Sequence, residues 1–188
     1  MRITPLLPVT ASMATAAAGL SLSAFAVDYM SPQQAQAALF PQADRFTVRE
    51  VALDAAALQA LATQAGAPAR SAQWKVVEAS QGGKLLGWVV VDNVVGKFEL
   101  ITYAVALTPE GVVRQVEVLS YRESHGGEVR LPAWRQQFVG KTAANGLRLG
   151  QDIANISGAT LSCAHLTEGV RRIAALVELA RSRRLLGG

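Results

Sequence analysis

Residues 152–162 combine hydroxyl groups with small side chains just before a helical pattern. Ser157, Gly158 and Ala159 are small, so a bulky group can approach the backbone closely there. Thr160 stands where the helix is expected to begin, and the free N–H groups and the dipole of a helix N-terminus favour an anion, above all a phosphate. The pattern predicts a phosphate site with a hydroxyl at its centre, able to hydrogen-bond the phosphate or to be esterified to it.

An ordinary helix N-cap explains the same residues without a ligand. Serine and threonine caps are common, and Gly158 would then only make a turn. Ser162 offers a second hydroxyl donor in either case. From local physical chemistry alone the cap is the more frequent arrangement, so the rest of the chain has to decide.

The same residues resemble the D-x-x-(S/T)-G-A-T flavin-attachment motif of the FMN-binding domain family. Residues 157–160 match its core, while Asp152 lies five residues before Ser157 and Asn155 lies nearer. The family includes the C subunit of the sodium-pumping NADH:quinone reductase and the G subunit of the Rnf complex. Its final threonine receives FMN through the phosphate from a flavin transferase that uses FAD. The resemblance therefore implies covalent FMN on Thr160.

A second stretch is similar to the small exported members of that family. Residues 121–129 read YRESHGGEV, like their Y-R-E-x-x-G-G-E-V segment, and Trp134, residues 137–138 and residues 140–141 follow at the expected places. The resemblance runs from about residue 76 to residue 177, and the two stretches together are more specific than either alone. Around Thr160 it implies these cofactor-binding residues: Ser157, Gly158, Ala159, Leu161, Ser162, Glu123, His125, Gly126, Gly127, Glu128, Trp134 and Lys141.

The chemistry of the second stretch agrees with a flavin nearby. Gly126 and Gly127 allow backbone amides to approach a flat ring. Arg122 or Lys141 could stabilise the anionic reduced flavin, and Trp134 could stack on its ring. A plain surface loop, solvated charges and a core tryptophan explain each side chain equally well. For the loop as a whole we expect flavin contact.

Cys163 and His165 follow the motif and raise the question of a thiol hydrolase. Side chains two residues apart on a helix point in different directions, and such a site needs a base facing the thiol. We expect a buried cysteine and a histidine that caps or faces a partner. A single cysteine excludes a disulfide within the chain, and two histidines, the other being His125, are too few to suggest a metal site.

The composition is that of a globular domain with a mild positive charge. Of 188 residues 51% are hydrophobic and 17% charged, with 18 Lys and Arg against 14 Asp and Glu, which excludes a disordered chain. The aromatic residues are not interleaved with the basic ones, so we expect no nucleic-acid partner. The excess charge falls mostly in the last helix, where we expect a solvated basic face, with contact to an anionic membrane surface or a phosphate as the alternative. Its members are Arg171, Arg172, Arg181, Arg183 and Arg184.

Residues 1–26 have the pattern of a signal peptide. Arg2 supplies the positive charge, residues 6–22 are apolar, and Ala24-Phe25-Ala26 is an A-x-A cleavage site. We expect a mature chain from Val27, in the periplasm or another extracytoplasmic place. An uncleaved N-terminal anchor is the alternative.

The elements that must position these residues begin with two helices and a strand. Ser31 and Pro32 start a helix that ends near Leu39, residues 46–53 alternate as a strand, and a second helix spans about 54–66. Strands follow, with a hairpin signal at Gln81-Gly82-Gly83, and short turns between them imply antiparallel pairing. These strands are expected at 74–79, 84–95, 98–107 and 112–121, and the one at 98–107 is expected to be central.

The rest of the chain is expected to hold the site and its supporting helix. Residues 122–150 read as a functional loop with a helical stretch around 132–138, and the last helix starts close to Ser162 with an apolar stripe. The fold class is α+β, an antiparallel sheet flanked by helices. The expected division is a signal peptide at 1–26, N-terminal helices and a first strand at 27–75, and an FMN-binding domain at 76–182. The stripe is Leu166, Val170, Ile173, Val177 and Ala180.

Together these features predict an exported electron carrier rather than a stand-alone enzyme. Covalent FMN would pass electrons to or from a membrane-bound redox protein, one that could hold haem, and a flavin transferase would be the second partner. Two other functions stay open: a module that binds FMN or another phosphate ligand without a covalent bond, and a periplasmic interaction domain without a cofactor.

Overall fold

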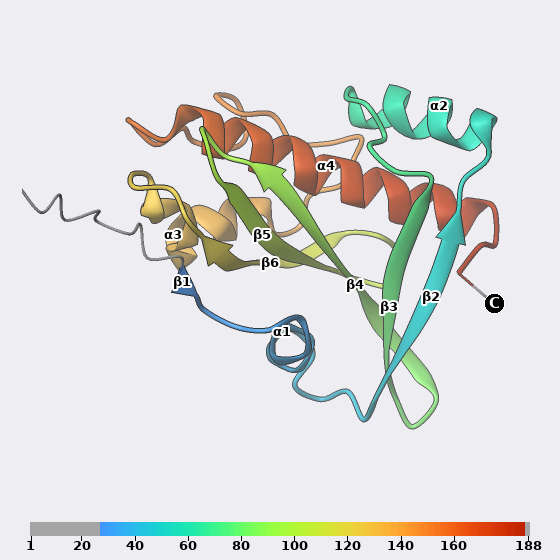
Figure 1. Cartoon of the computed structure of the whole chain (residues 1–188). Helices are drawn as coiled ribbons and strands as arrows, with labels where there is room; N and C mark the ends of the chain where they lie inside the picture. Colours follow the sequence, from blue (N-terminus) through green and yellow to red (C-terminus); the bar gives the residue numbers. More distant parts are fainter. Residues whose placement is uncertain (1–26, 187–188) are drawn as a thin grey trace, which may run out of the picture.

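A single antiparallel sheet forms the centre of the molecule, as seen in a computed structural model that describes residues 27–186 (Figure 1). The expected signal peptide lies outside the described residues. Six strands follow the spatial order β1-β6-β5-β4-β3-β2, and every neighbouring pair is antiparallel. The strands are β1 (Val27–Asp28), β2 (Arg45–Ala52), β3 (Gln73–Gln81), β4 (Lys84–Val95), β5 (Leu100–Leu107) and β6 (Val113–Tyr121).

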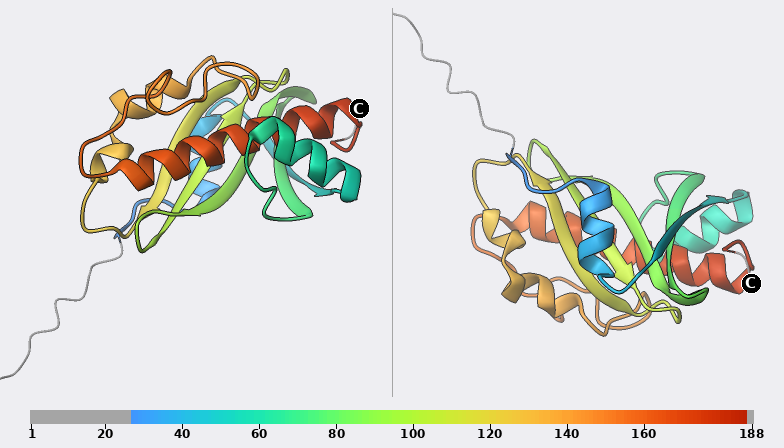
Figure 2. Two further views of the ribbon diagram at one scale, coloured as in Figure 1. Left: turned by 90° about the horizontal axis from the view of Figure 1, so that it is seen from above. Right: turned by 90° about the horizontal axis from the view of Figure 1, so that it is seen from below.

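Helices cover both faces of this sheet, which confirms the expected α+β class. The long helix α4 (Thr160–Ser182) crosses one face, with α2 (Ala55–Ala65) beside it, and α1 (Pro32–Leu39) packs on the other (Figure 2). Three short helical pieces, η1 (Gly127–Arg130), α3 (Pro132–Arg135) and η2 (Gln136–Phe138), follow β6. The segment after β6 therefore holds one more helical turn than the sequence indicated.

The helix ends follow local chemistry. Ser31 accepts from the backbone N–H of Gln34, whose side chain accepts from Ser31 in return, so α1 starts with a capping box. Asp54 accepts from the N–H of Ala57 at 2.7 Å, and Gly66 ends α2 with a φ of 62°. These caps confirm the expected starts and stops of both helices.

Helix α4 is the main support of the core. Its predicted apolar stripe is buried throughout. The expected solvated basic face is wrong for Arg172, because its side chain has no exposed area. It pairs with Asp92 at 3.3 Å and with Glu168 at 3.0 Å, and Tyr103 donates to the same Asp92 carboxylate. A buried cation is tolerated when charged and polar groups surround it in this way.

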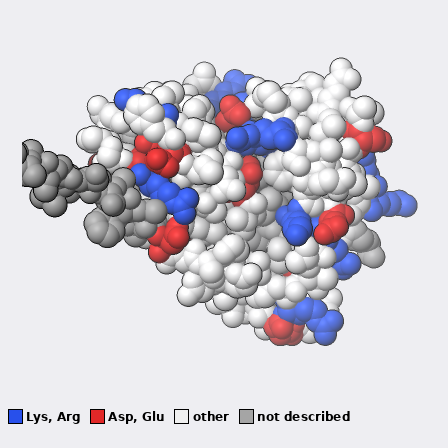
Figure 3. Space-filling view, in the orientation of Figure 1, with Lys and Arg blue, Asp and Glu red and all other residues white. Residues whose placement is uncertain are grey.

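Other charges lie on the surface in a mixed pattern. On the face shown in Figure 3, acidic and basic side chains stand near one another, without a large field of one sign. None of the helices within residues 27–186 is long and apolar enough to cross a membrane.

Candidate functional site

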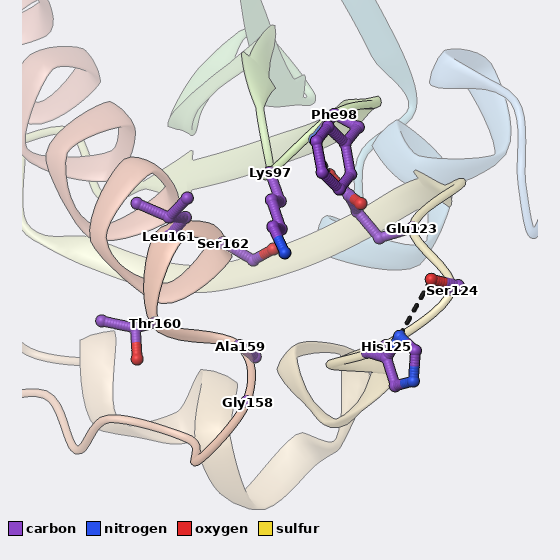
Figure 4. A pocket seen from close by; sticks show the side chains of 10 residues that line it. All are labelled: Lys97, Phe98, Glu123, Ser124, His125, Gly158, Ala159, Thr160, Leu161 and Ser162. Atoms are coloured by element: carbon purple, nitrogen blue, oxygen red, sulfur yellow. Dashed lines mark hydrogen bonds between the residues drawn. The ribbon is translucent and has the colours of Figure 1, made fainter.

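A cavity of about 520 Å³ opens where three elements meet. The tip of the β4–β5 hairpin, the segment after β6 and the N-terminus of α4 form its walls (Figure 4). Both stretches singled out in the sequence, 121–129 and 152–162, contribute to it, although other residues of the chain separate them. The cavity is lined by Lys97, Phe98, Glu123, Ser124, His125, Gly158, Ala159, Thr160, Leu161 and Ser162.

Thr160 is the first residue of α4 and is exposed at this cavity. Ala159 occupies the N-cap position, and no side chain caps the helix, so the first backbone N–H groups are left for a ligand or solvent. Asn155 donates from its amide to the Thr160 hydroxyl oxygen at 3.1 Å. Asn155, rather than Asp152, is therefore the residue of the approach segment that contacts the predicted acceptor.

Ala154 ties the approach segment to the helical pieces that follow β6. The indole N–H of Trp134 donates to its carbonyl at 2.8 Å, and its own N–H donates to the side chain of Gln137 at 2.8 Å. Trp134 is only 6% exposed and lies edge-on against Phe138, with ring centroids 5.0 Å apart. The structure thus places Trp134 in the core, outside the cavity, where it cannot stack on a ligand ring as the sequence suggested.

Gly126 brings the second stretch against the first. Its φ is 82°, and a Cβ at this position would overlap the Cβ of Ala159 and approach the hydroxyl of Tyr121. Tyr121 donates to the carbonyl of His125 and lies 3.4 Å from the hydroxyl of Ser162. Burial raises the pKa of Tyr121 and outweighs the hydrogen bond from Ser162, so the phenol stays protonated as a donor. This glycine serves contact between the two stretches of protein, rather than the expected contact with a ring.

Glu123 fixes the tip of the β4–β5 hairpin. Its carboxylate accepts from the N–H groups of Phe98 at 2.6 Å and Glu99 at 2.9 Å. A side chain on Gly96 would collide with this carboxylate. Burial alone would raise the pKa of this carboxyl, but the N–H groups of Glu99, Phe98 and Lys97 outweigh burial and hold the pKa below its ordinary value. Glu123 is therefore ionised and acts on the protein's own backbone.

Lys97 and Phe98 line the cavity but were missed as site residues from the sequence. The predicted strand at 98–107 starts at Leu100 instead, because Gly96 donates to the carbonyl of Glu99 and closes a turn. Phe98 is left at the turn, 75% exposed, with the Lys97 ammonium 4.9 Å from its ring centroid. The sequence signal that could have identified them is an aromatic residue next to a Gly-Lys pair between two strands.

Several predicted site residues lie elsewhere. Ser157 is exposed one residue outside the cavity wall, and Gly127 and Glu128 line a neighbouring shallow pocket. The structure contradicts the predicted flavin contact of Lys141. Its carbonyl accepts from the backbone N–H of Val113 at the start of β6. The cavity lies beyond the other end of this strand. At the usual rise per residue, the strand separates Lys141 from the cavity by about 25 Å. Its side chain therefore cannot reach a flavin in the cavity.

Arg122 also points away from this cavity. It pairs with Asp28 at 3.3 Å and lines a different cavity, beside α1 and β1. The stabilising charge expected from Arg122 or Lys141 is thus left to Lys97, which is the lysine or arginine that lines the cavity within residues 27–186.

Cys163 and His165 do not form a catalytic pair. Cys163 is fully buried, and burial raises the pKa of its thiol. The Nδ1 of His165 contacts the carbonyl of Val95 on β4, which can only accept, so this nitrogen carries the proton. The expectation of a buried cysteine is confirmed, and the histidine anchors α4 to the hairpin.

Comparison with known proteins identifies the domain. Residues 96–175 match the family model described as FMN-binding domain. The chain carries an FMN-binding domain. All ten cavity-lining residues fall inside the matched range. No curated protein matches the chain significantly.

A solved structure shows the same fold around the FMN-binding domain. The crystal structure of NqrC from Shewanella oneidensis aligns with a TM-score of 0.51 and 19% identity, over 80% of this chain and 88% of that chain. The alignment extends beyond the FMN-binding domain, so strands and helices before residue 96 share the architecture.

Proposed function

We propose that this chain is an exported flavoprotein that carries FMN as a phosphoester on Thr160 and passes electrons to or from a membrane-bound redox protein. The observation that carries the proposal is the position of Thr160. It lies at the uncapped start of α4, exposed to a cavity, inside the segment that matches the FMN-binding domain family.

The cavity fits a phosphorylated flavin. Its volume of about 520 Å³ falls in the range of about 300–1,000 Å³ usual for small-molecule sites. Gly158 has open space around its α-carbon, and Ala159 is small, so a phosphate can reach the backbone N–H groups of α4. Leu161 and Phe98 give apolar surface, and Lys97 gives a positive charge. A phosphate end, an apolar wall and a cation are what FMN requires.

The acceptor hydroxyl is open for esterification. Thr160 is exposed, and the amide of Asn155 leaves the hydroxyl proton free to depart because Asn155 is the donor of their hydrogen bond. With FAD as the source, the Thr160 oxygen bonds to the phosphorus of the FMN half, AMP leaves and the hydroxyl proton is lost. An amide is no base, so we expect the transferase to supply one.

Electron transfer follows from the chemistry of the cofactor. FMN takes up one or two electrons, while the protein sets its position and electrostatics. A covalent bond suits a protein outside the cytoplasm, where a dissociated cofactor would be lost. Export is supported by the signal pattern at residues 1–26, and the proposed partners are a flavin transferase and a membrane redox protein.

The site assignment is tested by peptide mass spectrometry. Protein produced together with a flavin transferase should show FMN less water on the peptide that contains Thr160. Thr160→Val should remove this mass and the yellow colour, while Thr63→Val, at an exposed threonine of α2, should keep both. Equal flavinylation of the Thr160→Val protein would disprove the assignment.

The same material separates the other two functions. A flavin that leaves the polypeptide on denaturation indicates a module without a covalent bond. Absence of a flavin spectrum after production with the transferase indicates an interaction domain without a cofactor.

A further inference from the structure

We propose that the tip of the β4–β5 hairpin, Lys97-Phe98, is the element that binds the isoalloxazine ring: Phe98 packs against the ring and Lys97 faces its negative edge. This inference rests on the proposed function, because it takes Thr160 as the point of attachment. The tip and Thr160 line the same cavity from different elements (Figure 4). A flavin tethered at one wall therefore meets the other.

Phe98 is a large apolar side chain in an unfavourable place for the bare protein. It is 75% exposed, although a phenyl ring gains about 1.5–3 kcal/mol from full burial. It is also not an isolated surface residue. Leu161, 46% exposed, stands across the same cavity. Two exposed apolar side chains in one cavity wall suit a ligand with a flat apolar ring.

The tip is fixed, so the exposure of Phe98 is built into the fold. Glu123 accepts two hydrogen bonds from the tip backbone, one of them from the N–H of Phe98 itself. His165 on α4 holds the carbonyl of Val95, one residue before the turn. Gly96 leaves room for the Glu123 carboxylate. Glu123 and His165, from two other elements, therefore hold the backbone that carries the ring, which lowers the entropy lost on binding.

Among the residues that line the cavity, Phe98 and His125 are the aromatic ones, because Trp134 lies in the core. The Nδ1 of His125 is hydrogen-bonded to the hydroxyl of Ser124, its neighbour in the segment after β6. Phe98 thus offers the hydrocarbon ring that offset or edge-on aromatic packing requires.

Lys97 supplies the charge. Among the described residues that line the cavity, Glu123 is the one carboxylate; it accepts from backbone N–H groups, and the nearby Lys97 charge adds to the lowering of its pKa. The Lys97 ammonium itself lies over the ring of Phe98. A cation beside the ring stabilises the reduced flavin, which is more negative than the oxidised form. Lys97 should therefore raise the midpoint potential of the bound flavin.

The contact of Phe98 is tested on flavinylated protein by quenching of flavin fluorescence with acrylamide, a neutral quencher that the Lys97 charge does not attract. If Phe98 covers one of the two ring faces, Phe98→Ala should raise the quenching constant about two-fold and change the visible circular dichroism. Val48→Ala, at an exposed residue on β2, is the matched control and should change neither.

Lys97 and Glu123 are tested on the same preparation. Lys97→Gln should lower the midpoint potential, while Lys84→Gln, at the other end of β4, should leave it unchanged. Glu123→Ala should reproduce the quenching of the Phe98→Ala protein, although the phenyl ring is still present. Glu123→Gln should restore most of the protection, because its amide oxygen still accepts from the tip.

The outcomes separate this inference from the function on which it rests. Intact mass is measured first: a wild-type protein without FMN refutes both. If the wild type carries FMN and Phe98→Ala changes neither quenching nor circular dichroism, the proposed function stands and the ring contact is wrong. Slower electron transfer with unchanged quenching would assign Phe98 to a redox partner and also overturn the inference.

Discussion

Gly126 and Glu123 show how single residues assemble this site. The left-handed backbone of Gly126 allows the segment after β6 to pack directly on Ala159, next to the predicted acceptor. Glu123, three residues earlier, reaches the hairpin tip instead. Two residues of one short segment therefore join the other two walls of the cavity.

Substitution of Gly126 tests the first of these contacts. Gly126→Ala should destabilise the fold by about 1–2 kcal/mol for the left-handed backbone and by about 1–3 kcal/mol more for the overlap with Ala159. Gly150 is the matched control, because its φ of 79° is similar and nothing lies within 4 Å of an added Cβ. Urea denaturation of both variants measures the difference, and equal losses would contradict the close contact.

Glu123 gives the site a dependence on pH. Its pKa is held below the ordinary value, so its stabilising effect is present above the unfolded-state pKa and is lost as the pH falls through the lower folded-state pKa. The tip should loosen below about pH 4. The amide resonances of Phe98 and Glu99 should titrate in that window, and Glu123→Gln should abolish the titration. A midpoint above the ordinary glutamate value would refute the hydrogen-bonded carboxylate.

At the scale of elements, α4 links the site to the core. It carries Thr160 at its first residue, and twelve residues later Arg172 ties it to β4 through Asp92. His165 adds a contact to the end of β4. The start of the helix is thus fixed against the hairpin by contacts along its length.

Arg172 has no exposed side-chain area, so its pair with Asp92 is shielded from solvent on the arginine side. Arg172→Met should lower the free energy of unfolding by about 3 kcal/mol, because it leaves the charge of Asp92 without its buried partner. Arg183→Met removes a surface pair with Asp54 and should change stability by no more than about 1 kcal/mol. Thermal or urea unfolding compares the two, and a similar small effect at both positions would show that the buried network is not stabilising.

Elements with local signals were predictable from the sequence. Ser31 and Asp54 cap their helices, Gly82-Gly83 turns the first hairpin, and the buried stripe of α4 has helical spacing. Trp134 and Lys141 were misplaced because nothing local distinguishes their surroundings. Trp134 is buried in the core, and its indole N–H donates to the carbonyl of Ala154, twenty residues away.

For the whole molecule, the sequence indicated which stretches meet but not how. The two stretches of the resemblance do form one cavity, because Gly126 packs on Ala159. Its third wall, Lys97-Phe98, depends on how β4 and β5 sit beside α4. The spacing of residues along the chain does not predict this arrangement. The position of Lys141 was not predictable for the same reason. The chain after β6 runs back to the start of that strand and takes Lys141 away from the cavity.

The central claim, a flavin joined to the polypeptide, is tested most directly by the intact mass of denatured protein that was produced together with a flavin transferase and exported. We predict the mass of the chain from Val27 onward plus one FMN less water. A bare polypeptide mass, from colourless material, would contradict the account.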